Sequence, residues 1–353
     1  MTFDDFIRRT FTLASKAQGS TWPNPLVGAV IVKNGKIIGE GFHHKAGEDH
    51  AEVDAFKNCK ESPEGATLFV NLEPCCHTNK TTPPCAQRVI TEKIKKVVIC
   101  NLDPNPEVNG KGVELLRQNG IEVEYGILAV EGELLNEAFF HAQRKKRPFV
   151  HLKMATSLDG RIALPSGESQ WITSEAARNH VHLLRSQYQA IAVGAETARK
   201  DNPKLSVRLD GFKNDQPWRI VFTRSGNLPP LLSLFTDDLK SKTLVYTQKP
   251  VTLDFPHEQV KIVQNLDEAM YDLFQKKIIT LFVEGGSLLA ASLMQEKLVN
   301  RISLYQNPSF LGAGPSALSD FGLTKLSERP KLQNIQSQWI GEDFYLTGKL
   351  TQE

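Results

Sequence analysis

The sequence of 353 residues has little of the features that mark membrane, secreted or nucleic-acid-binding proteins. No apolar run approaches the roughly 18 residues that a membrane helix needs, and the start lacks the basic-then-apolar layout of a secretory signal. The 42 basic residues nearly balance the 40 acidic residues, so no strong basic field favours nucleic acid. We therefore expect a cytoplasmic protein with neither a membrane nor a nucleic acid as its partner.

Cysteine is also scarce, and the five copies are unevenly spaced. Cys75, Cys76 and Cys85 lie close together, whereas Cys59 and Cys100 stand apart. An odd number with such clustering indicates a metal or catalytic site more than a disulfide framework, and it fits a reducing compartment.

The length and the order of apolar segments predict two α/β domains. Single hydrophobic cores stop growing at about 250–300 residues, so a chain of this length divides. We place the domains at residues 1–145 and 149–353. The basic stretch 144–147 (Arg-Lys-Lys-Arg) between them is interpreted as a solvated linker rather than a phosphate or nucleic-acid patch. In both parts, apolar strands alternate with helices, which is the pattern of layered α/β folds.

The first part opens with an amphipathic helix at 2–17, which Thr2 can cap. Asn24, just before the first buried strand, either caps a turn or reads the edge of a heterocycle with its amide. Asn34-Gly35 then predicts a hairpin between that strand, which ends at Val32, and its return. Further strands are expected at 36–42, 66–72, 96–100 and 122–128, and helices at 50–60, 85–95, 112–120 and 132–144.

One imidazole, two thiols and one carboxylate stand where these elements begin or end. His50 and Cys85 open helices, and Cys75 follows a strand. His-x-Glu followed by Pro-Cys and a later Cys is the pattern of zinc-dependent base deaminases. We therefore expect His50, Cys75 and Cys85 to bind Zn²⁺, with a fourth position for water, and Glu52 to carry protons. The alternative is separately buried cysteines and a capping histidine.

The loop between the two thiols is longer than in related patterns. Nucleic-acid and cytidine deaminases usually have two residues between their cysteines, whereas residues 76–84 intervene here. His77 and Lys80 are candidates to contact a phosphate or the heterocycle, with a solvated loop as the alternative. Cys76 is treated as a bystander, because adjacent cysteines rarely both reach one tetrahedral ion.

The second part contains an apolar strand, 279–283, that leads through Gly285-Gly286 toward a helix. Glycines let a backbone approach a ligand, and a helix start offers unpaired N–H groups to a phosphate. A tight turn is the alternative, and the segment is not the Gly-x-Gly-x-x-Gly fingerprint, so no Rossmann domain is expected. Other strands are expected at 149–158, 190–193, 219–223, 243–246, 260–263 and 302–305, with helices at 173–186 and 266–276. Residues 228–260 and 315–353 offer few motifs.

Several short runs resemble the family of bifunctional riboflavin-biosynthesis deaminase/reductases. In the first half these are 22–25 (Trp-Pro-Asn-Pro), 50–52 (His-Ala-Glu), 72–75 (Leu-Glu-Pro-Cys), 82–85 (Thr-Pro-Pro-Cys) and 103–106 (Asp-Pro-Asn-Pro). In the second half they are 153–155 (Lys-Met-Ala), 157–160 (Ser-Leu-Asp-Gly), 167–173, 194–208 and 283–286. The resemblance covers nearly the whole chain and includes the order of the domains. It implies an N-terminal cytidine-deaminase-like three-layer domain and a C-terminal dihydrofolate-reductase-like domain.

The resemblance also implies two consecutive reactions. A diaminopyrimidinone ribosyl phosphate would lose an amino group at the zinc site, and its ribosyl side chain would then be reduced to ribityl with NADPH. The implied NADPH-site residues are Ala155, Trp171, Thr197, Asp201, Gly286, Ser287, Leu288 and Leu289. Thr223, before Arg224, is a candidate to hold the adenosine 2′-phosphate.

The implied substrate-binding residues of the second half are Lys153, Ser169, Arg185, Leu205, Arg208 and Glu284. Arg185 and Arg208 are interpreted as phosphate clamps, because a guanidinium binds phosphate through two parallel hydrogen bonds. Lys153 and Asp201 are both candidates to assist ring opening or protonation.

Three other functions compete with this one. The chain would be a zinc deaminase of nucleic acids or nucleosides with an inactive or regulatory second domain, a single-function enzyme, or a regulator that binds zinc and nucleotide without catalysis. The near-zero net charge argues against a nucleic-acid substrate. A phosphorylated pyrimidine is the expected small-molecule partner, and a homodimer or higher homo-oligomer is the expected assembly.

Overall fold

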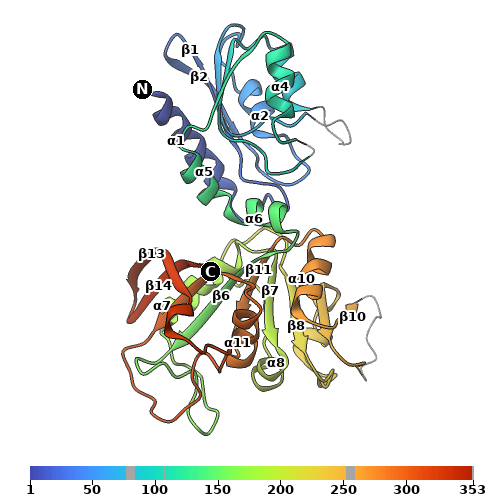
Figure 1. The fold of residues 1–353 in the computed structure, drawn as a ribbon, viewed down its shortest axis with the longest axis vertical. Coiled ribbons are helices and arrows are strands. Elements are labelled where there is room, and N and C mark those ends of the chain that lie inside the picture. The colour runs from blue at the N-terminus through green and yellow to red at the C-terminus, as the bar shows by residue number, and fades with distance from the viewer. Residues whose placement is uncertain (77–83, 107, 252–258, 352–353) are drawn as a thin grey trace. The chain divides into compact units, whose positions relative to one another are not determined.

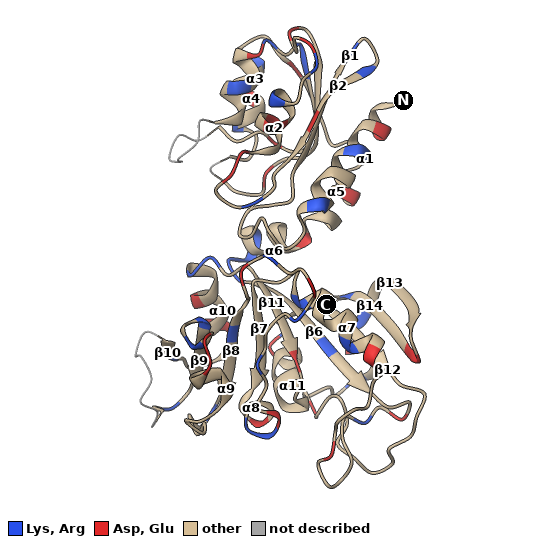
Figure 2. Cartoon of the chain, turned by 180° about the vertical axis from the view of Figure 1, so that it is seen from behind, with Lys and Arg blue, Asp and Glu red and all other residues tan. Residues whose placement is uncertain are grey.

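The computed structural model of the protein describes residues 1–76, 84–106, 108–251 and 259–351. The chain divides into two compact units, Met1–Lys146 and Arg147–Glu353, and each unit has its own sheet (Figure 1). Basic and acidic residues are interspersed along both units (Figure 2). Within the described ranges, no helix combines the length and the apolar character needed to cross a membrane.

A five-stranded sheet forms the centre of the first unit, with the strand order β2-β1-β3-β4-β5. Strand β1 is antiparallel to both of its neighbours, whereas β3, β4 and β5 are parallel. The strands are β1 (Gly28–Lys33), β2 (Lys36–Phe42), β3 (Thr67–Leu72), β4 (Lys96–Asn101) and β5 (Glu122–Tyr125).

Helices cover both faces of this sheet. On one face, residues of α2 (Ala51–Lys57), α3 (Cys85–Thr91) and α4 (Lys111–Gln118) share a core with the strands. On the other face, α1 (Phe3–Ala14) packs its apolar side chains against β1, β3 and β4. The predicted three-layer arrangement is therefore confirmed.

The first helix forms for the reason expected from its sequence. The Thr2 hydroxyl accepts a hydrogen bond from the Asp5 N–H, and the Asp5 carboxylate accepts one from the Thr2 N–H. This reciprocal cap satisfies two backbone donors that a helix start leaves free. The apolar face buries Phe6, Ile7 and Leu13, and the helix gives way to a short 3₁₀ turn, η1 (Ser15–Ala17).

Several predicted boundaries in this unit are wrong. The helices expected at 50–60 and 85–95 end at Lys57 and Thr91. The strand expected at 122–128 ends at Tyr125, because Gly126 turns the chain with a φ of +97°. The helix expected at 132–144 is two helices, α5 (Ala129–Leu135) and α6 (Glu137–Lys145), which meet at Asn136. The Asn136 amide hydrogen-bonds both the N–H and the carbonyl of Leu26, so this side chain serves the loop before β1.

A nine-stranded sheet forms the centre of the second unit, with the order β10-β9-β8-β7-β11-β6-β12-β14-β13. The strands from β10 to β12 are parallel, and β14 and β13 close one edge as an antiparallel hairpin. The strands are β6 (Phe149–Thr156), β7 (Ala190–Gly194), β8 (Trp218–Thr223), β9 (Thr243–Thr247), β10 (Val260–Ile262), β11 (Thr280–Glu284), β12 (Val299–Gln306), β13 (Lys331–Ile340) and β14 (Asp343–Thr351).

Helices pack on both faces of the second sheet as well. Residues of α10 (Leu266–Gln275) and α11 (Ser287–Gln295) share one core with the strands. On the other face lie α7 (Glu175–Arg185), α8 (Ala195–Asp201) and the short α9 (Ser233–Thr236). Among the described residues, η2 (Lys240–Lys242) and η4 (Leu326–Glu328) are further 3₁₀ turns. Because the parallel strands end at one edge, the loops after β6, β7 and β11 are neighbours, and ligands bind at such edges.

Candidate active sites

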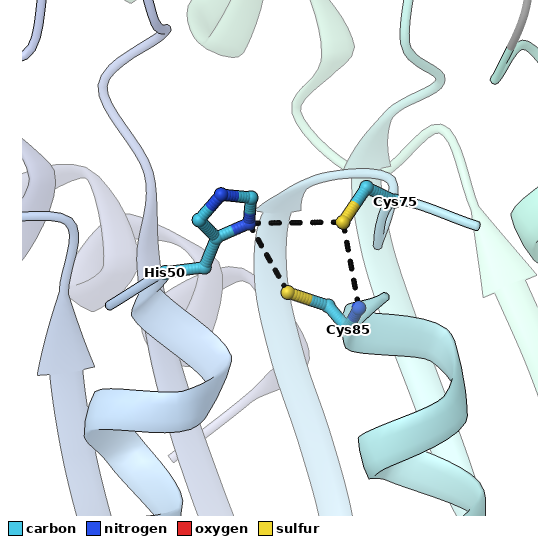
Figure 3. A group of neighbouring side chains, drawn as sticks. All are labelled: His50, Cys75 and Cys85. Carbon is cyan, nitrogen blue, oxygen red and sulfur yellow. Dashed lines mark hydrogen bonds between the residues drawn. The ribbon is translucent and has the colours of Figure 1, made fainter. Parts of the chain in front are cut away.

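Three ligand-type side chains converge in the first unit (Figure 3). His50 is the N-cap of α2, Cys85 is the first residue of α3, and Cys75 follows β3. The Nδ1 atom of His50 lies 3.7 Å from Cys75 Sγ and 3.2 Å from Cys85 Sγ. Nitrogen and sulfur ligands of a tetrahedral zinc ion are about 3.6 Å apart, given bond lengths of about 2.1 and 2.3 Å. The observed separations therefore suit one zinc ion.

The electrostatics of this group also favour a cation. The Cys85 N–H donates a hydrogen bond to Cys75 Sγ at 3.4 Å. The hydrogen bond with the Cys75 side chain, together with burial, raises the pKa of Cys85. Two buried thiols beside a carboxyl group oppose one another's ionisation, and a divalent cation removes that opposition. The donor set therefore fits Zn²⁺.

Glu52 lies in the first turn of α2 and is buried, with 3% of its surface exposed. Its side chain interacts with the Cys85 thiol, which places the carboxyl group beside the ligands. Burial is the main reason that the pKa of Glu52 is raised above the usual range of a carboxyl group. A buried carboxyl group beside the metal ligands is placed to take up and return a proton.

Asn24 reaches this site through a histidine that sequence analysis missed. Asn24 Nδ2 lies 3.1 Å from His43 Nε2, and the His43 ring lies edge-on to that of His50, with 5.4 Å between the ring centroids. The signal that could have found His43 is the hairpin register. Antiparallel pairing of β1 with β2 places the residues before β1 beside the residues after β2.

The predictions for the loop between Cys75 and Cys85 concern His77, Lys80 and Cys76. His77 and Lys80 lie outside the described residues. Cys76 is half-buried and packs against the hydrophobic core of the unit. Within the described part of the chain, it does not belong to the group formed by His50, Cys75 and Cys85.

In the second unit, Arg185 of α7 and Glu284 of β11 form a buried ion pair. Arg185 Nε lies 2.5 Å from Glu284 Oε1, and Nη2 lies 3.0 Å from Oε2. The remaining guanidinium nitrogen, Nη1, donates to the Ser206 carbonyl at 2.9 Å, and both paired side chains are 12% exposed. Burial raises the pKa of Glu284, but the positive charges of Arg185 and Lys153 outweigh burial and leave it below its usual value.

Lys153 lies on β6, paired in register with Glu284 of β11. Its Nζ atom lies 5.7 Å from the centroid of the Tyr305 ring. Burial lowers the pKa of Lys153. The negative charge of Glu284 opposes this shift, and the positive charge of Arg185 adds to it. A lysine with a lowered pKa gives up its proton more readily than a solvated one.

The predicted cofactor residues gather where β11 meets α11. Gly285 and Gly286 have φ angles of +77° and +85°, which explains glycine at both positions. A Cβ atom added to Gly286 would lie 3.1 Å from Thr197 Oγ1. Ser287, Leu288 and Leu289 form the first turn of α11. Ala155 lies on β6, which neighbours β11, so these predicted residues share one end of the sheet.

The other predicted residues differ in exposure. Trp171 is 68% exposed, and the Arg178 guanidinium carbon lies 4.4 Å from the centroid of its ring. Ser169 is half-buried, and Asp201, at the end of α8, is exposed. The Thr223 hydroxyl, at the end of β8, accepts a hydrogen bond from the Gly226 N–H at 3.2 Å.

The side chains of Arg208 and Leu205, both predicted to face the substrate, have opposite exposures. The backbone N–H of Arg208 donates to His182 Nδ1 at 3.2 Å, and the Arg208 side chain is exposed. Leu205 was expected to face the substrate, but its side chain is 2% exposed and packs in the core with α8 and α9. Any contact of Leu205 with a substrate therefore falls to its backbone, which has a φ of +47°.

Comparisons with known proteins agree over both halves. The family described as "Cytidine and deoxycytidylate deaminase zinc-binding region" matches residues 2–101, and "RibD C-terminal domain" matches residues 148–346. The chain is 41% identical to the "Riboflavin biosynthesis protein RibD" of Actinobacillus pleuropneumoniae, over 98% of this chain and 95% of that protein. It is 36% identical to the protein of that name from Escherichia coli, over 97% of each chain.

Solved structures give the same result. The structure of Acinetobacter baumannii RibD superposes with a TM-score of 0.90 and 35% identity, and the match covers 99% of both chains. A Thermotoga maritima protein described as a diaminohydroxyphosphoribosylaminopyrimidine deaminase/5-amino-6-(5-phosphoribosylamino)uracil reductase superposes with a TM-score of 0.88. It is 36% identical, again over 99% of both chains.

Proposed function

Because the chain belongs to the RibD family of riboflavin-biosynthesis proteins, we propose a division of labour between its two units, residue by residue. The chain is a zinc-dependent deaminase and an NADPH-dependent reductase. Its first unit is cytidine-deaminase-like, its second is dihydrofolate-reductase-like, and its substrate is a small phosphorylated pyrimidine. The observation that carries the proposal is the convergence of His50, Cys75 and Cys85 within a chain that matches the family over both halves.

In the first unit, His50, Cys75 and Cys85 hold the zinc ion. When bound, zinc supplies a water molecule whose pKa is lowered to about 7. Glu52 takes a proton from the attacking water and delivers it to the departing ammonia. Its burial and its position in the first turn of α2, which keeps it beside the ligands, support both roles. Asn24 reads the edge of the pyrimidine, and His77 and Lys80 contact its phosphate or ring.

In the second unit, Thr197 and the Gly286–Leu289 turn hold NADPH together with Ala155, Trp171, Asp201 and Thr223. When bound, NADPH supplies the reducing equivalent, and the protein supplies position and protons. Lys153 is the proposed proton donor for opening the ribose ring, because it is buried and pairs in register with Glu284. Asp201 lies at the exposed end of α8, although partial burial raises the pKa of its carboxyl group. Glu284, held by Arg185, fixes the charge balance around Lys153.

The phosphate of the substrate requires a cationic group that is free to move toward it. Arg208 is exposed, and its backbone is held by His182, so it is the stronger clamp. Arg185 already binds Glu284 with two hydrogen bonds, and its contribution to the phosphate is secondary. Ser169 and the backbone of Leu205 complete the proposed substrate site.

The proposed assembly is a cytoplasmic homodimer or higher homo-oligomer. Strand β13 is an edge strand whose Ile335 and Trp339 are 56% and 66% exposed. Exposed apolar side chains on an unpaired edge are typical of a surface that pairs with another chain. Sedimentation of the purified chain tests this, and the mass of a single chain would contradict it.

A combined assay tests the two activities directly. The full chain is given the diaminopyrimidinone ribosyl phosphate with NADPH, while ammonia and NADPH absorbance are both followed. Ammonia release followed by loss of absorbance supports the proposal, and ammonia without NADPH oxidation contradicts the reductase assignment. A nucleic-acid or nucleoside deaminase with an inactive second unit is not adopted, because the family match includes both halves.

A further inference from the structure

His43 connects the zinc ligands to Asn24 in the first unit. It directly follows β2 and is only 3% exposed. Both of its ring nitrogens lie against protein atoms: Nδ1 is 2.9 Å from the Asp49 carbonyl oxygen, and Nε2 is 3.1 Å from Asn24 Nδ2. Because both nitrogens are engaged, the ring acts through its neighbours rather than by binding a ligand itself.

These contacts fix the tautomer of His43. A carbonyl oxygen can only accept a hydrogen bond, so Nδ1 carries the proton. In a neutral imidazole protonated on Nδ1, Nε2 is an acceptor and requires a donor opposite it. The Asn24 amide therefore turns its nitrogen toward His43, as observed.

We propose that His43 is a positioning residue that fixes the amide of Asn24, so that the Asn24 carbonyl oxygen accepts a hydrogen bond from an N–H group of the pyrimidine. This inference rests on the proposed role of Asn24 in substrate binding. A flipped amide would present its N–H donors to that N–H group, and the hydrogen bond would be lost. A buried polar contact of this kind discriminates strongly between ring edges that donate and ring edges that accept.

His43 also touches the backbone just before a zinc ligand, because Asp49 immediately precedes His50. This second contact offers a purely structural explanation for the residue, and side-chain length separates the two roles. A glutamine side chain carries its amide to about the position of Nε2, whereas an asparagine carries its amide to about the position of Nδ1. His43→Gln therefore keeps an acceptor for Asn24, and His43→Asn keeps a donor for Asp49.

The experiment compares both variants with Asn24→Ala and the double variant Asn24→Ala/His43→Asn in the full chain. Zinc content, and kcat and KM for ammonia release from the diaminopyrimidinone ribosyl phosphate, are measured for each. NADPH oxidation with the deaminated substrate serves as an internal control for the second unit. His44→Gln is the matched surface control, because His44 is exposed and its Nε2 faces Asp54 at 3.2 Å.

If His43 positions Asn24, His43→Asn keeps its zinc and raises KM about 10- to 100-fold, as expected for a lost hydrogen bond to a buried partner. His43→Gln then stays near the wild-type KM, and the double variant is no worse than Asn24→Ala alone. Loss of zinc in His43→Asn, or additive effects in the double variant, would overturn the inference. An unchanged KM in Asn24→Ala would instead overturn the proposed role of Asn24, and absence of ammonia release by the wild type would overturn the proposed function.

Discussion

The two units hold the charged groups of their candidate sites in opposite ways. In the first, two thiols, an imidazole and a carboxyl group lie together. Burial raises the pKa of Glu52, and the hydrogen bond with Cys75, together with burial, raises the pKa of Cys85. In the second, the buried Glu284 is matched by Arg185 and approached by Lys153. The first site therefore needs a cation from outside the chain, whereas the second carries its own. Perturbing the metal should affect one unit and perturbing the ion pair the other.

Removing a zinc ligand should reduce zinc binding and ammonia release more than any other single change proposed for this chain. Cys75→Ser should reduce bound zinc from about one ion per chain to nearly none and lower ammonia release by more than about 1000-fold, because the activated water is lost. Cys76→Ser is the matched control and should retain both. Metal analysis and ammonia release check the pair, with NADPH oxidation on deaminated substrate expected to persist in both variants. Equal loss of zinc in the two variants would refute the assignment of ligands.

Breaking the ion pair should mainly affect the second unit. Arg185→Met leaves Glu284 buried without its main partner, which costs about 3–5 kcal/mol in the free energy of unfolding. Lys200→Met is the control, because it breaks an exposed pair with Glu196 that contributes about 0–1 kcal/mol. The urea midpoint of unfolding is measured for both variants, with loss of NADPH oxidation as the signal. Similar midpoints for the two variants would show that the buried ion pair stabilises the unit no more than the exposed pair does.

The same ion pair predicts a pH dependence with a definite sign. The pKa of Glu284 is lower in the folded chain than in the unfolded chain. The stability contributed by its ionised form is thus present above the unfolded-state pKa and is lost as pH falls through the lowered value. In the wild type, the unfolding midpoint should therefore fall as pH decreases in the acid range. Arg185→Met should make this fall, the acid limb of the pH profile, less steep. An acid limb identical to that of the wild type would point to other carboxylates.

A smaller effect distinguishes the two proton-donor candidates. Lys153→Met should lower kcat for NADPH oxidation by about 100-fold, within the range of general acid catalysis. Asp201→Asn should lower it by less than about threefold, since Asp201 is exposed and is proposed to contact only the cofactor. Steady-state kinetics with the deaminated substrate compare them. The reverse ranking would move the proton donor from β6 to the end of α8.

The convergence of His50, Cys75 and Cys85 could be anticipated from the sequence because these residues stand at element ends. His50 and Cys85 are 35 positions apart, yet each begins a helix that the hydrophobic pattern reveals. His43 was missed because its role depends on hairpin pairing, which brings it to Asn24 from 19 positions away. A buried histidine with two protein partners leaves no motif in a single sequence.

The second site was harder to predict because its contacts are long-range. Arg185 and Glu284 were both expected near the substrate, but their bond spans 99 positions and depends on how α7 meets β11. Strand β13 was not predicted at all, since most of its residues are exposed and show no alternation between buried and exposed positions. Propensity and periodicity report local order, and neither reports which distant strands become neighbours.

Glu52 is proposed to drive the reaction of the first unit and to have no part in the reaction of the second. The measurement is ammonia release and NADPH oxidation by Glu52→Gln, with the diaminopyrimidinone ribosyl phosphate and separately with its deaminated product. Glu61→Gln, an exposed acid of the same unit, is the control. We predict that Glu52→Gln loses both signals on the first compound, retains zinc, and oxidises NADPH normally on the second. Ammonia release by Glu52→Gln at the wild-type rate would show that Glu52 is not the proton carrier of the first unit.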